Sequence, residues 1–207
     1  MVNIQKAAVI GCGFVGSTIA YTLMQKGFFS EMVLLDANQP KAEGEAMDIS
    51  HGLPFSHAMD IYAGSYEDIA DAAVVIITAG ANQKPGETRL DLVHKNAKIM
   101  KSIISEIKRV KCEGILLIVS NPVDILTQVA LQESGLPKER VIGSGTVLDT
   151  ARLKYLISEK LKVDSRNVHA FIAGEHGDSE LPVWSCANIY GISLYEFAKM
   201  KGFTDFK

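Results

Sequence analysis

Short apolar runs recur along the first two thirds of the chain and alternate with longer segments. The runs cover residues 7–10, 32–35, 61–63, 74–77, 115–119 and 141–142. They are rich in β-branched side chains and mostly do not alternate with polar residues, which is typical of strands buried on both faces. They therefore predict a sheet that is covered on both sides.

Several segments between the runs have helical spacing. In residues 89–110, apolar side chains recur three and four positions apart, which predicts a long amphipathic helix. Residues 17–25, 123–132 and 147–161 are expected to form further helices. This alternation predicts an α/β fold, a doubly wound parallel sheet with helices on both faces. Ligands of such sheets bind outside the carboxyl ends of the strands.

The composition indicates a globular protein without a nucleic-acid or membrane partner. Of 207 residues 47% are apolar, and the net charge is −3, which argues against disorder and against binding to polyanions. The apolar runs are too short to span a membrane, and no signal peptide is expected. Cys12, Cys112 and Cys186 are odd in number and lack metal-type spacing. We therefore expect reduced thiols, no metal site and a cytoplasmic location.

The first apolar run ends in a glycine turn, residues 11–16, with the spacing G-x-G-x-x-G. Gly11 allows a sharp turn, Gly13 has no Cβ where a pyrophosphate would approach, and Gly16 lets the next helix pack tightly on the strand. The free N–H groups at the start of that helix favour a phosphate. By itself, the spacing fits a plain strand-to-helix turn equally well.

An acidic residue follows at the end of the second run. Asp36 lies twenty residues after Gly16, where its carboxylate can accept hydrogen bonds from a ribose diol and would repel a ribose phosphate. The alternative is an ordinary turn aspartate. Together with the glycine turn, Asp36 favours a dinucleotide site that binds NAD rather than NADP.

Two later strand ends also carry polar residues. Residues 79–89 are polar and broken by glycine and proline, which suggests a mobile lid; the alternative is a solvated connection in which Arg89 begins the next helix. Pro122 keeps Asn121 out of the helical region, so that its amide can project past the fifth strand. A simple Asn-Pro helix start fits this pair as well.

The last candidates lie beyond residue 145. Asp149 and Arg152 are three positions apart and share one helix face. Thr146 and Asp149 could instead form a helix N-cap pair, with Arg152 paired to Asp149. His176, between two glycines, could exchange a proton near neutral pH or be a turn histidine bonded to a neighbour.

Five motifs occur in one order: residues 9–16, 82–89, 120–124, 145–152 and 174–178. In this they resemble the bacterial L-lactate dehydrogenases of the lactate/malate dehydrogenase superfamily. The resemblance implies a Rossmann domain over residues 1–145 and the first part of an α+β substrate domain over residues 146–207. It also implies reversible hydride transfer between NADH and pyruvate in fermentation, and a homo-oligomer that is a tetramer in full-length members.

The resemblance implies roles for five side chains. His176 would exchange a proton with pyruvate or L-lactate, and Asp149 would hold its imidazole. Arg152 would bind the substrate carboxylate bidentately. Arg89, carried by the lid, would polarise the carbonyl and expel water, and Asn121 would hydrogen-bond near the reacting oxygen.

The cofactor contacts implied in the same way extend beyond the glycine turn. They are Gly11, Cys12, Gly13, Phe14, Val15, Gly16, Asp36, Lys41, Tyr66, Gly80, Ala81, Ser102, Asn121 and Ser144.

Substrate choice would depend on Gln83, because malate dehydrogenases have arginine at the matching position. A neutral side chain would leave a second carboxylate unpaired, which favours pyruvate over a dicarboxylate. Two other functions stay open: a malate or other 2-hydroxy-acid dehydrogenase, and a non-catalytic NAD-binding fragment.

A further expectation concerns activation by fructose 1,6-bisphosphate. Activated members place two basic residues at an anion site between subunits. His169 matches one of them, and Lys154 stands where arginine is usual. Lysine keeps the charge but lacks the bidentate fork.

Overall fold

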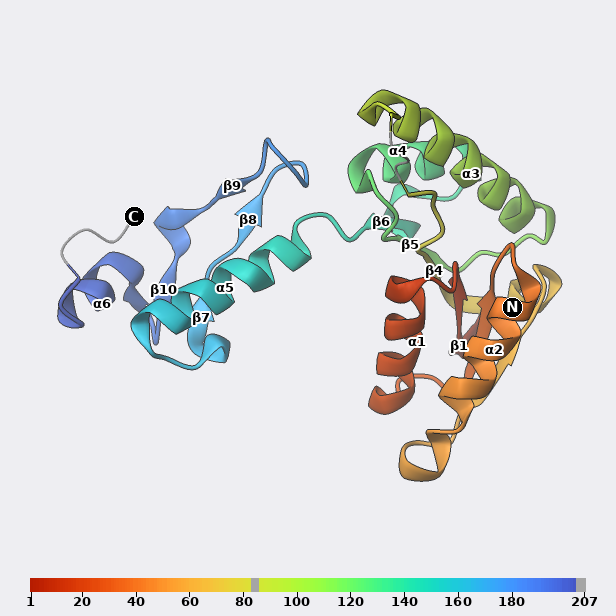
Figure 1. The fold of residues 1–207 in the computed structure, drawn as a ribbon, viewed down its shortest axis with the longest axis horizontal. Helices are drawn as coiled ribbons and strands as arrows, with labels where there is room; N and C mark the ends of the chain where they lie inside the picture. The colour runs from red at the N-terminus through yellow and green to blue at the C-terminus, as the bar shows by residue number, and fades with distance from the viewer. Residues whose placement is uncertain (83–85, 204–207) are drawn as a thin grey trace. The chain divides into compact units, whose positions relative to one another are not determined.

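All six predicted strands pair into one parallel sheet, in the order β3-β2-β1-β4-β5-β6 (Figure 1). The strands are β1 Asn3–Ile10, β2 Glu31–Leu35, β3 Asp60–Ala63, β4 Ala72–Ile77, β5 Ile115–Ile118 and β6 Val141–Gly143. This doubly wound order confirms the predicted Rossmann fold. The order reverses between β1 and β4, so a ligand crevice is expected at the carboxyl ends of these two strands.

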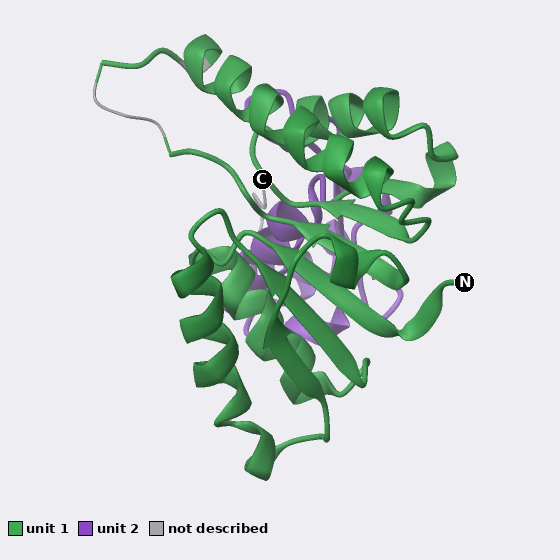
Figure 2. Cartoon of the chain, turned by 90° about the vertical axis from the view of Figure 1, so that its right-hand side faces the viewer, with its two compact units in different colours: residues 1–143 green, residues 144–207 purple. Residues whose placement is uncertain are grey.

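The computed structural model describes residues 1–82 and 86–203. The chain divides into two units between Gly143 and Ser144 (Figure 2), whereas the sequence placed the boundary between residues 145 and 146. Within the part of the chain that is described, no helix is long and apolar enough to cross a membrane.

Four α-helices connect the strands of the first unit. They are α1 Phe14–Lys26, α2 Gln39–Ser50, α3 Arg89–Arg109 and α4 Val123–Ser134, and short 3-10 turns cover Leu53–Phe55, Glu67–Ile69 and Lys138–Arg140. The helix α3 begins at Arg89 because Thr88 and Asp91 form a capping box. The sequence did not predict α2, because it buries only Ala42, Ala46 and Ile49 in an otherwise polar segment.

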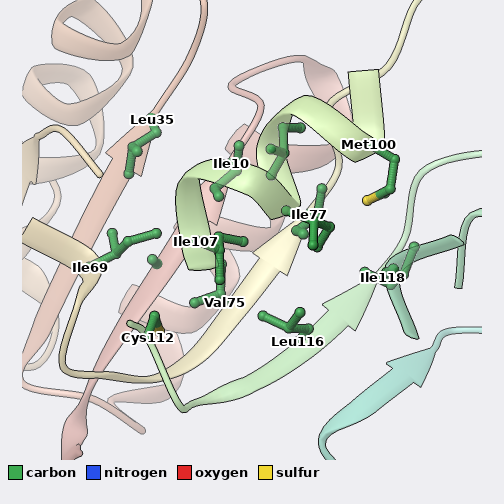
Figure 3. Close-up of a cluster of buried hydrophobic side chains, with 14 of the residues drawn as sticks. Ile10, Leu35, Ile69, Val75, Ile77, Met100, Ile107, Cys112, Leu116 and Ile118 are labelled. Carbon is green, nitrogen blue, oxygen red and sulfur yellow. The ribbon is translucent and has the colours of Figure 1, made fainter. Parts of the chain in front are cut away.

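Successive residues of β1 face opposite sides of the sheet. Ala8 and Ile10 pack in the cluster that α3 and α4 cover, whereas Val9 packs in the cluster formed with α1 and α2. Figure 3 shows the first cluster, where side chains of β4 and β5 meet those of α3. Because both faces are buried, the strands form continuous apolar runs in the sequence.

The second unit has a hydrophobic core of its own, between α5 and a small antiparallel sheet. Its elements are α5 Val147–Leu161, β7 Val168–His169, β8 Ile172–Ala173, β9 Leu181–Pro182, β10 Asn188–Ile189, β11 Ile192–Ser193 and α6 Leu194–Met200, with 3-10 turns at Ser165–Asn167 and Trp184–Cys186. The strands pair in the orders β11-β10-β7 and β8-β9. This mixture of helix and antiparallel sheet is the predicted start of an α+β domain.

We predict that Leu116→Ala lowers the free energy of unfolding of the first unit by about 2–5 kcal/mol, because Leu116 is fully buried and alanine leaves a cavity. The matched control is Ile115→Ala on the same strand. Its side chain is 38% exposed, and its loss should cost only about 1 kcal/mol. Urea titrations followed by far-ultraviolet circular dichroism measure both losses, and equal losses would contradict the different burial of the two side chains.

Candidate functional site

The glycine turn after β1 is packed against the end of β4. Gly11 has a φ of 102°, and its carbonyl accepts a hydrogen bond of 2.7 Å from the Thr78 hydroxyl. A Cβ on Gly16 would lie 1.8 Å from the carbonyl oxygen of Gly11, so only glycine allows α1 to begin this close to the turn. A Cβ on Gly13 would meet nothing within 4 Å. Gly13 therefore keeps open a space that a ligand can use.

Asp36 at the end of β2 is tied to the glycine turn. One carboxylate oxygen accepts from the N–H of Cys12 at 2.7 Å, and the other accepts from the N–H of Asn38 at 2.8 Å. The turn therefore positions the acidic group that we expect at the ribose. The Cys12 thiol lies beneath the turn, where burial raises its pKa to about 11, so it stays a neutral thiol.

A cavity of about 1120 Å³ lies along the carboxyl ends of β1, β2 and β4. The predicted cofactor residues that line it are Gly11, Gly13, Asp36, Lys41, Tyr66, Gly80, Ala81 and Ser102. Burial raises the pKa of the Tyr66 hydroxyl, which is therefore protonated at neutral pH. The size of the cavity and the open edge at Gly13 fit an extended phosphate-bearing ligand.

A second cavity, of about 240 Å³, shares Gly80, Ala81 and other residues of this strand edge with the first. It also contains Val15 and Asn121, two more of the predicted cofactor residues. Asn96 of α3 lines it as well. Sequence reasoning missed Asn96 because a single asparagine inside an amphipathic helix has no local signature.

The second unit brings three predicted residues together. Nδ1 of His176 lies 2.6 Å from Oδ2 of Asp149, and Nη1 of Arg152 donates to Oδ1 of the same carboxylate at 3.1 Å. Asp149 is 6% exposed, whereas the side chain of Arg152 is 62% exposed. A carboxylate can only accept, so Nδ1 is the donor and carries the ring proton. Glu180 is a further neighbour, with one oxygen 4.0 Å from Nδ1.

The pKa of Asp149 is lower than usual despite its burial. Burial pushes the pKa upward, but the hydrogen bond from His176 and the charge of Arg152 outweigh it. Asp149 is therefore ionised at neutral pH and provides a fixed negative charge beside the imidazole.

Two threonines, Thr146 at the N-cap of α5 and Thr150 within it, hold the segment that leads to His176. The Thr146 hydroxyl donates to the carbonyl of Ile172 at 2.6 Å, and Thr150 Oγ1 accepts from the N–H of Ile172 at 3.0 Å. The alternative of a capping pair is wrong, because the Thr146 side chain makes no cap hydrogen bond. Sequence reasoning missed this contact, because the partner of both threonines, Ile172, lies more than twenty positions away.

The other site residues predicted from the sequence lie in several parts of the chain. Phe14 is 97% exposed at the start of α1. Ser144 lies before α5, and its backbone carbonyl accepts from the N–H of Val147. Lys154 is half-buried on α5, and His169 is exposed on β7. Gln83 lies outside the described residues, and of Arg89 only the backbone is described, as the first residue of α3.

The fold and the glycine turn define the class of protein, a dinucleotide-binding α/β domain followed by a unit with an Asp–His pair. The chain belongs to the lactate/malate dehydrogenase family. The NAD binding domain of this family matches residues 5–143, and its alpha/beta C-terminal domain matches residues 146–206.

Within the family, this chain is similar to proteins that are named L-lactate dehydrogenase. It is 60% identical over 191 residues to an L-lactate dehydrogenase of Acetivibrio thermocellus, covering 92% of this chain and 60% of that protein. It is 58% identical over 193 residues to an L-lactate dehydrogenase of Priestia megaterium, covering 93% of this chain and 61% of that protein. The chain thus spans about three fifths of the length of these relatives.

Solved structures agree with this placement. A lactate dehydrogenase from a Medee basin deep-sea metagenome library superposes with a TM-score of 0.92 at 53% identity, over 96% of this chain and 63% of that one. The minor L-lactate dehydrogenase of Enterococcus mundtii also has a TM-score of 0.92, at 48% identity, over 94% of this chain and 62% of that one.

We predict losses of stability of different size for two alanine substitutions in the glycine turn. Gly16→Ala should destabilise the first unit by about 1–3 kcal/mol or more, because its Cβ overlaps the carbonyl of Gly11. Gly13→Ala should cost less than about 1 kcal/mol, since its Cβ meets only open space. Thermal melting followed by circular dichroism compares them, and similar losses would show that the turn packs differently.

We predict that Asp149 makes the stability of the second unit depend on acid pH. Its pKa is lower in the folded than in the unfolded chain, so its contribution is complete above the unfolded value of about 3.9 and is lost as pH falls through the folded value. Asp149→Asn should be less stable than the unchanged chain at pH 6, and this difference should shrink toward pH 3.

Fluorescence of Trp184, the single tryptophan, reports unfolding of the second unit in urea. Hydrogen bonds from Arg166 lower the pKa of Asp164 to about 2. Because Asp164 titrates in both proteins, its effect cancels in the difference between their free energies of unfolding. A difference that stays constant with pH would contradict the ionised Asp149–His176 pair.

Proposed function

We propose that this chain carries the catalytic groups of an NAD-dependent L-lactate dehydrogenase, which interconverts pyruvate and L-lactate. The observation that carries the proposal is the 2.6 Å hydrogen bond between His176 and the buried Asp149, with Arg152 on the same carboxylate. The names of the relatives support the same activity.

The first unit would hold the cofactor. The open space at Gly13 and the N-terminus of α1 would take the pyrophosphate, Asp36 the adenosine ribose, and Lys41, Tyr66 and Ser102 the remaining surface of the cavity. When bound, NADH supplies the hydride. Asp36 would also exclude the phosphate of NADP by charge repulsion.

His176 would move the proton. Because Asp149 accepts from Nδ1, the proton exchanged with the substrate oxygen would be on Nε2. The ionised carboxylate would stabilise the imidazolium and hold the ring in one orientation, as in other His–Asp pairs. Such a proton donor typically contributes about 10²–10⁴-fold to the rate.

Arg152 would bind the substrate carboxylate. Its guanidinium uses Nη1 to reach Asp149, and the planar fork has further N–H donors for a second anion. The pairing with Asp149 limits how the fork can rotate. We propose Arg89 as the group that polarises the carbonyl, and Asn121 as a hydrogen-bond donor near the reacting oxygen.

We also propose the assembly, the location and one further ligand of the full-length protein. The full-length protein would be a homo-oligomer, a tetramer as in its family, and would work in the cytoplasm, which suits three free thiols. Lys154 and His169 are the proposed contacts for fructose 1,6-bisphosphate.

Steady-state oxidation of NADH with pyruvate and with oxaloacetate tests the proposed reaction. We expect pyruvate to have the higher kcat/KM by about a hundredfold or more, because Gln83 offers no charge to a second carboxylate. A preference for oxaloacetate would make the protein a malate dehydrogenase. NADH binding without oxidation by pyruvate would make this chain a non-catalytic cofactor-binding fragment.

We predict that His176→Asn lowers kcat by about 10²–10⁴-fold while the Kd for NADH stays unchanged, because the imidazole belongs to the second unit, whereas the glycine turn and Asp36 belong to the first. The control is His51→Asn, an exposed histidine of the first unit, which should leave kcat unchanged. A His176→Asn variant with full kcat would remove the proposed proton donor.

A further inference from the structure

The buried amide of Asn96 is a polar group that the proposed mechanism does not use. Asn96 lies on α3, seven residues after Arg89, and is only 4% exposed. It faces the edge of the sheet where β4 and β5 end, and it lines the second cavity with Ala81 and Asn121. Buried amides in native proteins are paired, so its partners indicate its purpose.

The side chain of Asn96 connects two loops. Its Oδ1 accepts from the N–H of Ala81 at 2.8 Å, in the loop after β4. Its Nδ2 donates to the carbonyl of Asn121 at 2.8 Å, in the loop after β5, and lies 3.4 Å from the carbonyl of Ala81. One amide thus joins the backbones of two loops that carry proposed cofactor and substrate contacts.

This arrangement needs both a donor and an acceptor at one short side chain. Aspartate at position 96 would keep the bond from the N–H of Ala81 but would place an oxygen against the carbonyl of Asn121. Leucine has a similar shape but forms neither bond. In each case at least one part-buried backbone group would lose its partner.

The loops are also joined nearer the sheet. The hydroxyl of Ser120 donates to the carbonyl of Ala79 at 2.7 Å and lies 3.1 Å from the carbonyl of Ile77. Ser120 therefore holds the strand ends together, whereas Asn96 holds the next residues outward, Ala81 and Asn121. Loss of Asn96 should release these outer residues without separating the strands.

We propose that Asn96 is a positioning residue that holds the loops at Ala81 and Asn121 in the arrangement required by the nicotinamide half of the cofactor. This rests on the proposed function. The residues proposed for the adenosine half, Asp36, Lys41 and Tyr66, line only the first cavity and are not among the hydrogen-bond partners of Asn96. Of those partners, Ala81 lines both cavities and Asn121 lines only the second. The two halves of the cofactor should therefore respond differently to a change at position 96.

The affinities of the 207-residue chain for NADH, measured by fluorescence, and for AMP, measured by calorimetry, test the proposal. Asn96→Asp and Asn96→Leu should each weaken NADH binding about tenfold, the effect of losing one to two hydrogen bonds, and should leave AMP binding unchanged. The matched control is Ile104→Val, which loosens the packing of the same helix at a fully buried position in the hydrophobic core. It should leave the NADH-to-AMP affinity ratio unchanged.

Amide hydrogen exchange at Ala81 in the ligand-free chain provides the second measurement. Exchange should be faster in Asn96→Leu, which cannot accept from the N–H of Ala81, than in the unchanged chain and in the Ile104→Val variant. In Asn96→Asp this acceptor is kept, so exchange should change less than in Asn96→Leu. Unchanged exchange at Ala81 in Asn96→Leu, or equal weakening of NADH and AMP binding, overturns the positioning role. If the unchanged chain binds no NADH, the proposed function fails, while the exchange rates still decide whether Asn96 orders the loops.

Discussion

The contact between the start of α1 and the turn after β1 is the constraint on which the cofactor edge of the first unit depends. A Cβ on Gly16 would overlap the carbonyl oxygen of Gly11, so glycine is the residue that allows this approach. Thr78 just after β4 then bonds the same carbonyl, and Asp36 after β2 bonds the N–H of Cys12. Three neighbouring strands are thus joined to one turn, and the turn both forms the phosphate-binding edge and orients the acid beside it.

The second unit depends on a buried charge. Asp149 would be costly to ionise in an apolar setting, but His176 and Arg152 both donate to it. The histidine reaches the helix because Thr146 and Thr150 bond Ile172, shortly before it in the chain. The same hydrogen bonds that make the carboxylate tolerable therefore give the imidazole a defined tautomer and orientation.

Periodicity alone predicted most of the first unit, since strands buried on both faces and the amphipathic α3 leave strong apolar patterns. The helix α2 was missed because two of its three buried residues are alanines, which carry little apolar signal. Asp36, His176 and the glycine turn could be proposed because each lies at a strand end in a recognisable pattern. Asn96, Thr78 and Thr150 could not, since polar residues in helices and at strand ends are common and acquire meaning only through a distant backbone partner.

The sequence by itself determined the order of strands and helices, the glycine spacing and the residue types available for chemistry, because these depend on side-chain size, polarity and local backbone preference. Tertiary structure decided which polar groups meet. It paired Asp149 with His176 across 27 positions and joined Ala81 to Asn121 through Asn96. Such pairings depend on how helices pack on the sheet, and packing distances between residues far apart in the chain are not encoded in any local pattern.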